Sequence, residues 1–118
     1  MAKILIIDDE HSILESLDMF LGEKGHTMFK ADNGKDGYSI FSRETPEVVI
    51  LDIRLPDMNG LDVLARIQEN RRPTKVIMMT AFQDMETTIE AMKRGAYDYL
   101  HKPLDAELVE KTVNRALH

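Results

Sequence analysis

Ile-Leu-Ile-Ile-Asp-Asp-Glu, residues 4–10, joins four apolar residues directly to three acids. A short run that is apolar at every position is typical of a strand buried on both faces, as in a parallel sheet covered by helices. Val-Val-Ile-Leu at 48–51 and Val-Ile-Met-Met at 76–79 have the same character, and 27–31 and 98–101 are weaker candidates. The sequence therefore predicts five strands.

Amphipathic stretches separate these runs. Two of them have apolar stripes at helical spacing, formed by Ile13, Leu14, Leu17, Phe20 and Leu21 in one and by Leu108, Val109, Thr112, Val113 and Ala116 in the other. Stretches around 34–42, 60–69 and 85–94 fill the remaining gaps. Alternating strands and helices form a parallel sheet with right-handed crossovers. We therefore predict a single α/β domain over residues 1–118, a flavodoxin-like doubly wound five-stranded parallel sheet (order 2-1-3-4-5) with five helices.

Composition argues against several classes of protein. The 118 residues include no cysteine, so the chain can form neither a disulfide nor a thiolate metal site. No apolar run approaches the ~18–20 residues of a membrane span, and residues 1–3 lead into a strand rather than a signal peptide. A net charge of -6 disfavours binding to a phosphate backbone. We expect a cytoplasmic domain that contacts neither a membrane nor nucleic acid directly.

Polar side chains follow the predicted strands at their carboxyl ends, where the binding crevice of an open parallel sheet lies. They are Asp8 and Asp9 after the first strand, Asp52 after the third, Thr80 and Ala81 after the fourth, and Lys102 after the fifth. Taken alone, an acid or hydroxyl there is often a turn or cap residue, and a Lys before Pro is mostly a surface residue. In the order 2-1-3-4-5 the first and third strands are neighbours, so the three carboxylates should converge.

Convergent carboxylates need an opposite charge nearby. Two like charges about 4 Å apart repel by roughly 4 kcal/mol at an effective dielectric near 20. Hard oxygen ligands suit Mg²⁺, which takes a few carboxylates together with waters and a phosphate oxygen. A carboxylate can also attack phosphorus and form an aspartyl phosphate, a reaction that requires mainly positioning and charge neutralisation. Mg²⁺, the Lys102 ammonium and the Thr80 hydroxyl would supply both.

At these residues the chain resembles the receiver domain of bacterial response regulators over essentially its whole length. Four segments carry the resemblance: Ile-Leu-Ile-Ile-Asp-Asp-Glu at 4–10, Leu-Asp-Ile-Arg-Leu-Pro-Asp-Met-Asn-Gly at 51–60, Met-Thr-Ala at 79–81, and Gly-Ala-Tyr-Asp-Tyr-Leu-His-Lys-Pro at 95–103. Residues 80–103 are most similar to receivers of sigma-54-dependent activators of the nitrogen-regulation type. This implies the N-terminal part of a longer regulator, although a stand-alone receiver would end at about the same place.

The resemblance implies a role for each acid. Asp52 would accept a phosphoryl group from a histidine kinase. Asp9 and Asp52 would bind Mg²⁺ through their side chains, together with the backbone carbonyl of Arg54. Asp8 would act largely through a metal-bound water. The chain would be a regulatory phosphoacceptor that assists its own phosphotransfer and dephosphorylation, rather than an enzyme.

The resemblance also implies how the signal leaves the site. Thr80, the Ala81 amide and Lys102 would hold the phosphoryl group, and the Lys102–Pro103 bond would be cis. Thr80 and Tyr99 would act as switch residues that alter the face formed by the fourth helix, fifth strand and fifth helix. That face would control an output domain, such as an ATPase and DNA-binding region of a longer protein, or a partner protein. Phosphorylation would favour a homodimer.

Three other functions fit the residues less well. A Mg²⁺-dependent phosphatase with an aspartyl nucleophile needs Asp-x-Asp after the first strand, whereas Asp8 and Asp9 are adjacent. A degenerate receiver that acts only as an interaction module should lack an acid, the Thr or the Lys, and all are present. A flavin or dinucleotide binder should have a glycine-rich loop after the first strand, where this chain has acids.

Overall fold

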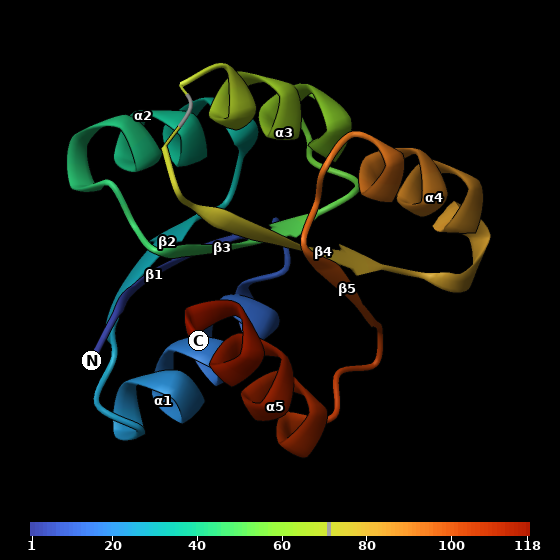
Figure 1. Cartoon of the computed structure of the whole chain (residues 1–118). Helices are drawn as coiled ribbons and strands as arrows, with labels where there is room; N and C mark the ends of the chain where they lie inside the picture. The colour runs from blue at the N-terminus through green and yellow to red at the C-terminus, as the bar shows by residue number, and fades with distance from the viewer. Residues whose placement is uncertain (71) are drawn as a thin grey trace.

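Five parallel strands form the centre of the computed structural model, which describes residues 1–70 and 72–118 (Figure 1). The strands are β1 (Lys3–Ile7), β2 (Thr27–Ala31), β3 (Val48–Asp52), β4 (Lys75–Thr80) and β5 (Asp98–His101). Their order in the sheet is β2-β1-β3-β4-β5, and all neighbouring pairs are parallel. The predicted topology is confirmed, and each strand lies within one residue of its expected range at either end.

Helices cover both faces of the sheet. Figure 1 shows α1 and α5 on one face and α2, α3 and α4 on the other. The helices are α1 (His11–Glu23), α2 (Gly34–Glu44), α3 (Gly60–Glu69), α4 (Met85–Lys93) and α5 (Ala106–Leu117), and a short 3-10 helix, η1 (Phe82–Asp84), precedes α4. The five helices were predicted, and η1 was not. None of the helices in the described ranges combines the length and apolar character that a membrane crossing needs.

The two helical layers explain why β1 is apolar at almost every position. Successive side chains of a strand point to opposite faces. Ile4 and Ile6 pack with residues of α1 and α5, and Leu5 and Ile7 pack with residues of α2 and α3. All four side chains are fully buried. The apolar run therefore ends at the crevice edge, and the acids that follow it begin there.

Candidate functional site

The carboxyl ends of four strands bring the predicted site residues to one edge of the sheet. Asp8 follows β1, Asp52 is the last residue of β3, and Thr80 is the last residue of β4. Strand β3 lies between β1 and β4. Lys102 follows β5, and its backbone amide donates a hydrogen bond of 2.9 Å to the carbonyl oxygen of Thr80. The convergence expected from the strand order is therefore present.

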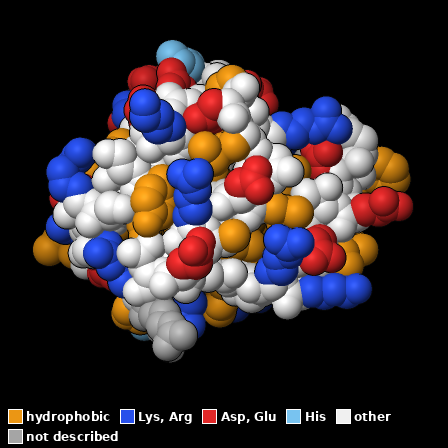
Figure 2. Space-filling model, turned by 90° about the horizontal axis from the view of Figure 1, so that it is seen from above, with side chains coloured by type: hydrophobic (Ala, Val, Ile, Leu, Met, Phe, Trp, Pro, Cys, Tyr) orange, Lys and Arg blue, Asp and Glu red, His pale blue; other side chains and the backbone are white. Residues whose placement is uncertain are grey.

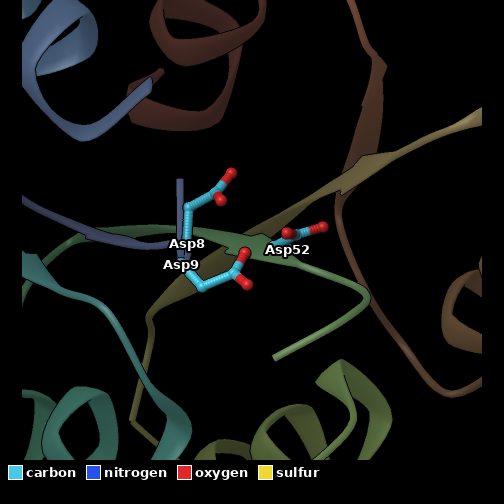
Figure 3. A group of neighbouring side chains, drawn as sticks. All are labelled: Asp8, Asp9 and Asp52. Carbon is cyan, nitrogen blue, oxygen red and sulfur yellow. The ribbon is translucent and has the colours of Figure 1, made fainter. Parts of the chain in front are cut away.

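Three carboxylates form a cluster at this edge (Figure 3). One oxygen from each of Asp8, Asp9 and Asp52 lies within 4.8 Å of the others. Asp8 and Asp52 are buried, whereas Asp9 is exposed. Burial, followed by the charge of Asp8, raises the pKa of Asp52 to about 6, although Lys102 counteracts part of this effect. The folded chain thus retains unfavourable charge that a further cation would relieve.

Lys102 is the cation that partly offsets this cluster. Its Nζ lies 3.0 Å from Asp8 Oδ2, 3.2 Å from Asp52 Oδ2 and 2.9 Å from Glu10 Oε1. Burial alone would lower the pKa of Lys102, but the hydrogen bond to Glu10 and the Asp8 and Asp52 carboxylates outweigh it, so the pKa is raised. The sequence analysis expected Lys102 to supply positive charge at the site and to hold the phosphoryl group, and it did not predict the contact with Glu10.

Glu10 is a site residue that the sequence analysis did not assign. It stands at the N-cap of α1, but its side chain makes no capping hydrogen bond. Glutamate is not among the favoured capping residues, and here its carboxylate accepts a hydrogen bond from Lys102 instead. The sequence did contain a signal for this contact, because Glu10 directly follows Asp8 and Asp9. A third acid at the same strand end adds negative charge that a nearby cation would stabilise.

The acid cluster is chemically suited to Mg²⁺. Its donors are all carboxylate oxygens, the hard ligands that this ion prefers. Among the described residues, Asp8 Oδ2 is buried without a well-aligned hydrogen-bond partner, even though the Lys102 ammonium is only 3.0 Å away. A buried, incompletely satisfied carboxylate oxygen is costly unless a cation is near. Arg54, whose carbonyl was the predicted third ligand, places its amide 3.4 Å from Asp52 Oδ1.

The loop from β3 to α3 folds back closely against β3. The Gly60 amide donates to the carbonyl oxygen of Ile53 at 2.6 Å, and a Cβ on Gly60 would lie 2.5 Å from the Asp52 carbonyl oxygen. Only glycine permits this approach. Asp57 in the same loop accepts hydrogen bonds from the amides of Gly34 and Lys35, at 2.8 and 2.9 Å. These bonds at the N-terminus of α2 fix the loop and lower the pKa of Asp57.

The two predicted switch residues lie at different depths. Thr80 is fully buried, its hydroxyl donates to the Ala81 carbonyl at 3.0 Å, and it accepts a hydrogen bond of 2.7 Å from Thr88. Tyr99 on β5 is 37% exposed and lies edge-on to His101, with ring centroids 5.4 Å apart. The Lys102–Pro103 bond is cis, as the resemblance implied.

A family model for the response regulator receiver domain matches residues 4–114. The chain belongs to this family. Regulatory protein AtoC of Escherichia coli (strain K12) is 37% identical over 115 residues, which are 98% of this chain and 25% of AtoC. Protein PilH of Pseudomonas aeruginosa is 35% identical over 119 residues, covering 99% of this chain and 98% of PilH. A crystal structure of a receiver domain protein from Clostridium thermocellum has a TM-score of 0.93 at 36% identity, covering 98% of this chain and 94% of that one.

The relatives also confirm the narrower resemblance. AtoC, PilR and NtrC, all sigma-54-dependent activators, are among the similar proteins. The chain spans about a quarter of the length of AtoC and PilR, 25% and 26%. Receiver domains are regulatory phosphoacceptor domains of two-component systems and bind Mg²⁺ at an acidic pocket. In this receiver the cluster of Asp8, Asp9 and Asp52 could hold the ion.

Proposed function

We propose that this receiver is a signalling switch that accepts a phosphoryl group on Asp52 from a histidine kinase. The observation that carries the proposal is the buried Asp52 carboxylate, which lies beside Asp8 and Asp9 and 3.2 Å from the Lys102 ammonium at the crevice edge. In the transfer a carboxylate oxygen of Asp52 forms a bond to phosphorus. The bond from phosphorus to the donor nitrogen breaks, and its electron pair stays on the imidazole, which takes up a proton.

The neighbouring residues would stabilise the charge of the phosphoryl group. Lys102 is already 3.2 Å from Asp52 Oδ2 and needs little movement to contact a phosphoryl oxygen. The Thr80 hydroxyl and the Ala81 amide are the hydrogen-bond donors at the end of β4. Fixed donors of this kind lower the barrier of phosphoryl transfer through positioning and electrostatics. The same groups would assist hydrolysis of the acyl phosphate, so the domain promotes its own reactions without turning over a substrate.

Mg²⁺ is the cofactor that we propose for this reaction. Asp8, Asp9 and Asp52 with the Arg54 carbonyl would hold it, Asp8 largely through water. When bound, the ion would neutralise charge between the carboxylates and the phosphoryl oxygens. The all-oxygen donor set and the raised pKa of Asp52 support this assignment. Lys102 would then exchange part of its contact with Asp8 and Asp52 for contact with the phosphoryl group.

A groove beside the site offers a docking surface for the kinase. It has a volume of about 640 Å³ and runs between α1 and α5, from Glu10 and Lys102 over Ile13, Leu17, Phe20 and Leu104. The helix that carries the phosphohistidine must bring its phosphorus to Asp52, and this groove leads directly to the lysine that contacts Asp52. Apolar grooves with polar ends suit amphipathic helices. We therefore place a kinase helix there.

The output would leave through the face of α4, β5 and α5. Ile89, Tyr99 and Leu108 are exposed large hydrophobic side chains on these elements. Arg115 lies 3.8 Å from Asp98, an ion pair within the face that a second copy could exchange. We propose that this face forms a phosphorylation-dependent homodimer or docks an output domain. AtoC and PilR are about four times as long as this chain and support the second alternative. In it, residues 1–118 would form the receiver domain of a cytoplasmic transcription regulator with a separate ATPase and DNA-binding region.

We also propose that the receiver does not bind nucleic acid directly. The net charge is -6. On the face seen in Figure 2, basic side chains are interspersed with acidic ones. A binding surface for a phosphate backbone would instead gather Lys and Arg on one face.

The test is labelling with a small phosphodonor. Wild-type protein incubated with acetyl phosphate and Mg²⁺ should gain the mass of one phosphoryl group, and chelation of the metal should abolish the gain. Asp52→Asn should gain none. Asp57→Asn is the matched control, because it removes another acid from the loop that follows Asp52, and it should still be labelled. Undiminished labelling of Asp52→Asn would overturn the assignment.

A further inference from the structure

A buried carboxylate lies outside the acid cluster, at the start of α4. The side chain of Asp84, the last residue of η1, is 9% exposed. Both of its oxygens accept hydrogen bonds from Arg54 Nε, at 2.9 and 3.1 Å, and Oδ1 lies 2.8 Å from the second guanidinium nitrogen. Hydrogen bonds between two charged groups are shorter and stronger than those between neutral groups. The pair joins the β3–α3 loop to the β4–α4 loop across the crevice.

The same loop is tied to the predicted switch residue. The Thr88 hydroxyl, buried on α4, donates toward two acceptors, the Asp84 carbonyl oxygen at 2.9 Å and Thr80 Oγ1 at 2.7 Å. Hydrogen bonds therefore connect Arg54, two residues after the acceptor, through Asp84 and Thr88 to Thr80. Arg54 and Thr80, at the two ends of this hydrogen-bond network, both flank Asp52. The position of the β4–α4 loop is therefore coupled to Asp52 through both residues.

We propose that the Arg54–Asp84 pair is a latch that holds the β4–α4 loop in its unphosphorylated position, and that a phosphoryl group on Asp52 releases it by competing for the Arg54 guanidinium. Asp84 is thus a positioning residue that acts through Arg54 and Thr88. The proposal rests on the proposed function. Phosphate and carboxylate are both bidentate partners of arginine, and phosphorylation places a dianion two residues from Arg54.

The charges around Arg54 support this competition. Hydrogen bonds from the guanidinium to Asp84 raise the pKa of Arg54, and the charge of Asp52 raises it further. The guanidinium therefore already lies within the field of the acceptor carboxylate. A phosphoryl group would raise that negative charge from −1 to about −1.5 to −2 on the acceptor side. The charge of Asp84 does not change, so the attraction of the Arg54 guanidinium to the acceptor side increases relative to its attraction to Asp84.

Release would move the loop because Asp84 is buried. A buried carboxylate that loses its cation is strongly unfavourable, and movement toward water is the way to relieve it. Such movement displaces the Asp84 carbonyl oxygen, which is one of the two acceptors of Thr88. Because Thr88 lies in the first turn of α4, a shift of that turn would also change its 2.7 Å hydrogen bond to Thr80 Oγ1. One event at Arg54 would thus change the surroundings of Thr80 and the start of α4 together.

Asp84→Asn tests the latch because it keeps the size of the side chain and removes its charge. In the metal-free protein, amide signals around Thr80 and Tyr99 should move toward the positions of wild type saturated with beryllofluoride and Mg²⁺. The variant should also bind beryllofluoride more tightly, by roughly five- to tenfold, the lower range of coupling between sites. Glu90→Gln, which breaks the 2.9 Å Arg94–Glu90 pair elsewhere on α4, should change neither quantity.

Each outcome of these measurements supports or contradicts a stated hypothesis. A gain in affinity cannot come from mere destabilisation, and it should disappear in Arg54→Gln/Asp84→Asn, because the freed guanidinium is then absent. Wild-type affinity together with wild-type amide positions in Asp84→Asn would overturn the latch. If that variant fails to fold, Arg54→Gln, whose side chain is 67% exposed, gives the same metal-free comparison. Failure of the wild type itself to bind beryllofluoride would instead contradict the proposed function.

Discussion

Replacement of the Asp52 carboxylate by an amide should stabilise the metal-free protein at neutral pH. Burial, followed by the charge of Asp8, raises the pKa of Asp52 from 3.8 to about 6. Between these values the folded protein binds more protons than the unfolded chain, so the free energy of unfolding falls as the pH rises through this window. Asp52→Asn has no such proton to lose. Its advantage should therefore be complete above about pH 6 and absent below about pH 4.

The size of the effect follows from the shift. About two pKa units at 1.36 kcal/mol each correspond to about 3 kcal/mol. This figure already includes the favourable contact with Lys102, because that contact lowers the pKa of Asp52. Solvent at the mouth of the crevice screens the repulsion. We therefore expect Asp52→Asn to raise the free energy of unfolding by about 1–2 kcal/mol at neutral pH.

Urea denaturation without metal, at neutral pH and near pH 4, measures the effect. Asp57→Asn is the opposite-sign control. Hydrogen bonds from the Gly34 and Lys35 amides lower the pKa of Asp57, so its charge contributes stability at neutral pH that is lost as the pH falls. The two variants should thus deviate from wild type in opposite directions and converge on it in acid. A less stable Asp52→Asn at neutral pH, or a gain that persists in acid, would refute the reasoning.

Further predictions concern the metal, the loop and the output. Mg²⁺ at 100 times its dissociation constant should stabilise the wild type by roughly 2.7 kcal/mol, and Asp9→Asn should lose most of this gain. A melting temperature of the wild type that does not change with Mg²⁺ would argue against the site. Gly60→Ala should cost about 1–3 kcal/mol and weaken Mg²⁺ binding in calorimetry, because its Cβ would lie 2.5 Å from the Asp52 carbonyl oxygen. Thr80→Ala should still accept a phosphoryl group, yet show much less beryllofluoride-dependent dimerisation in sedimentation.

The fold could be predicted from the sequence because the apolar pattern of the strands already indicates that helices cover both faces of the sheet. A run such as residues 48–51 is apolar at every position only if helices cover both faces, and its continuation into Asp52 marks the crevice edge. Short right-handed crossovers limit the possible topologies, and the order 2-1-3-4-5 is a common one for an open doubly wound sheet of five strands. Convergence of Asp8, Asp9 and Asp52 needed no further knowledge, because parallel strands end on the same edge.

The polar contacts across the crevice could not be predicted in this way. Arg54 and Asp84 are 30 residues apart, and each sits in a loop whose path depends on the packing of the following helix. Thr88 lies on the buried face of α4, where its hydroxyl could as well have bonded only to its own helix backbone. Lys102 was assigned to a phosphoryl group, but its position among three carboxylates depends on the rotamers of Asp8 and Glu10. Sequence spacing places residues on an edge and does not orient their side chains.

The contacts available at the site limit how completely this receiver can switch alone. A change in population from 1:99 to 99:1 takes about 5.5 kcal/mol of differential stabilisation, whereas one hydrogen bond to a charged group contributes roughly 1.5–3 kcal/mol. Thr80 exchanges a carbonyl partner for a phosphoryl oxygen, and Lys102 exchanges one anion for another. Each exchange therefore contributes less than the full energy of a new hydrogen bond to the difference between the two states. We therefore expect a partial shift in the isolated domain that contacts between two copies complete. The switched fraction at saturating beryllofluoride, measured from the Tyr99 amide, should then rise with protein concentration; a fraction that is complete and independent of concentration would show that no second copy is needed.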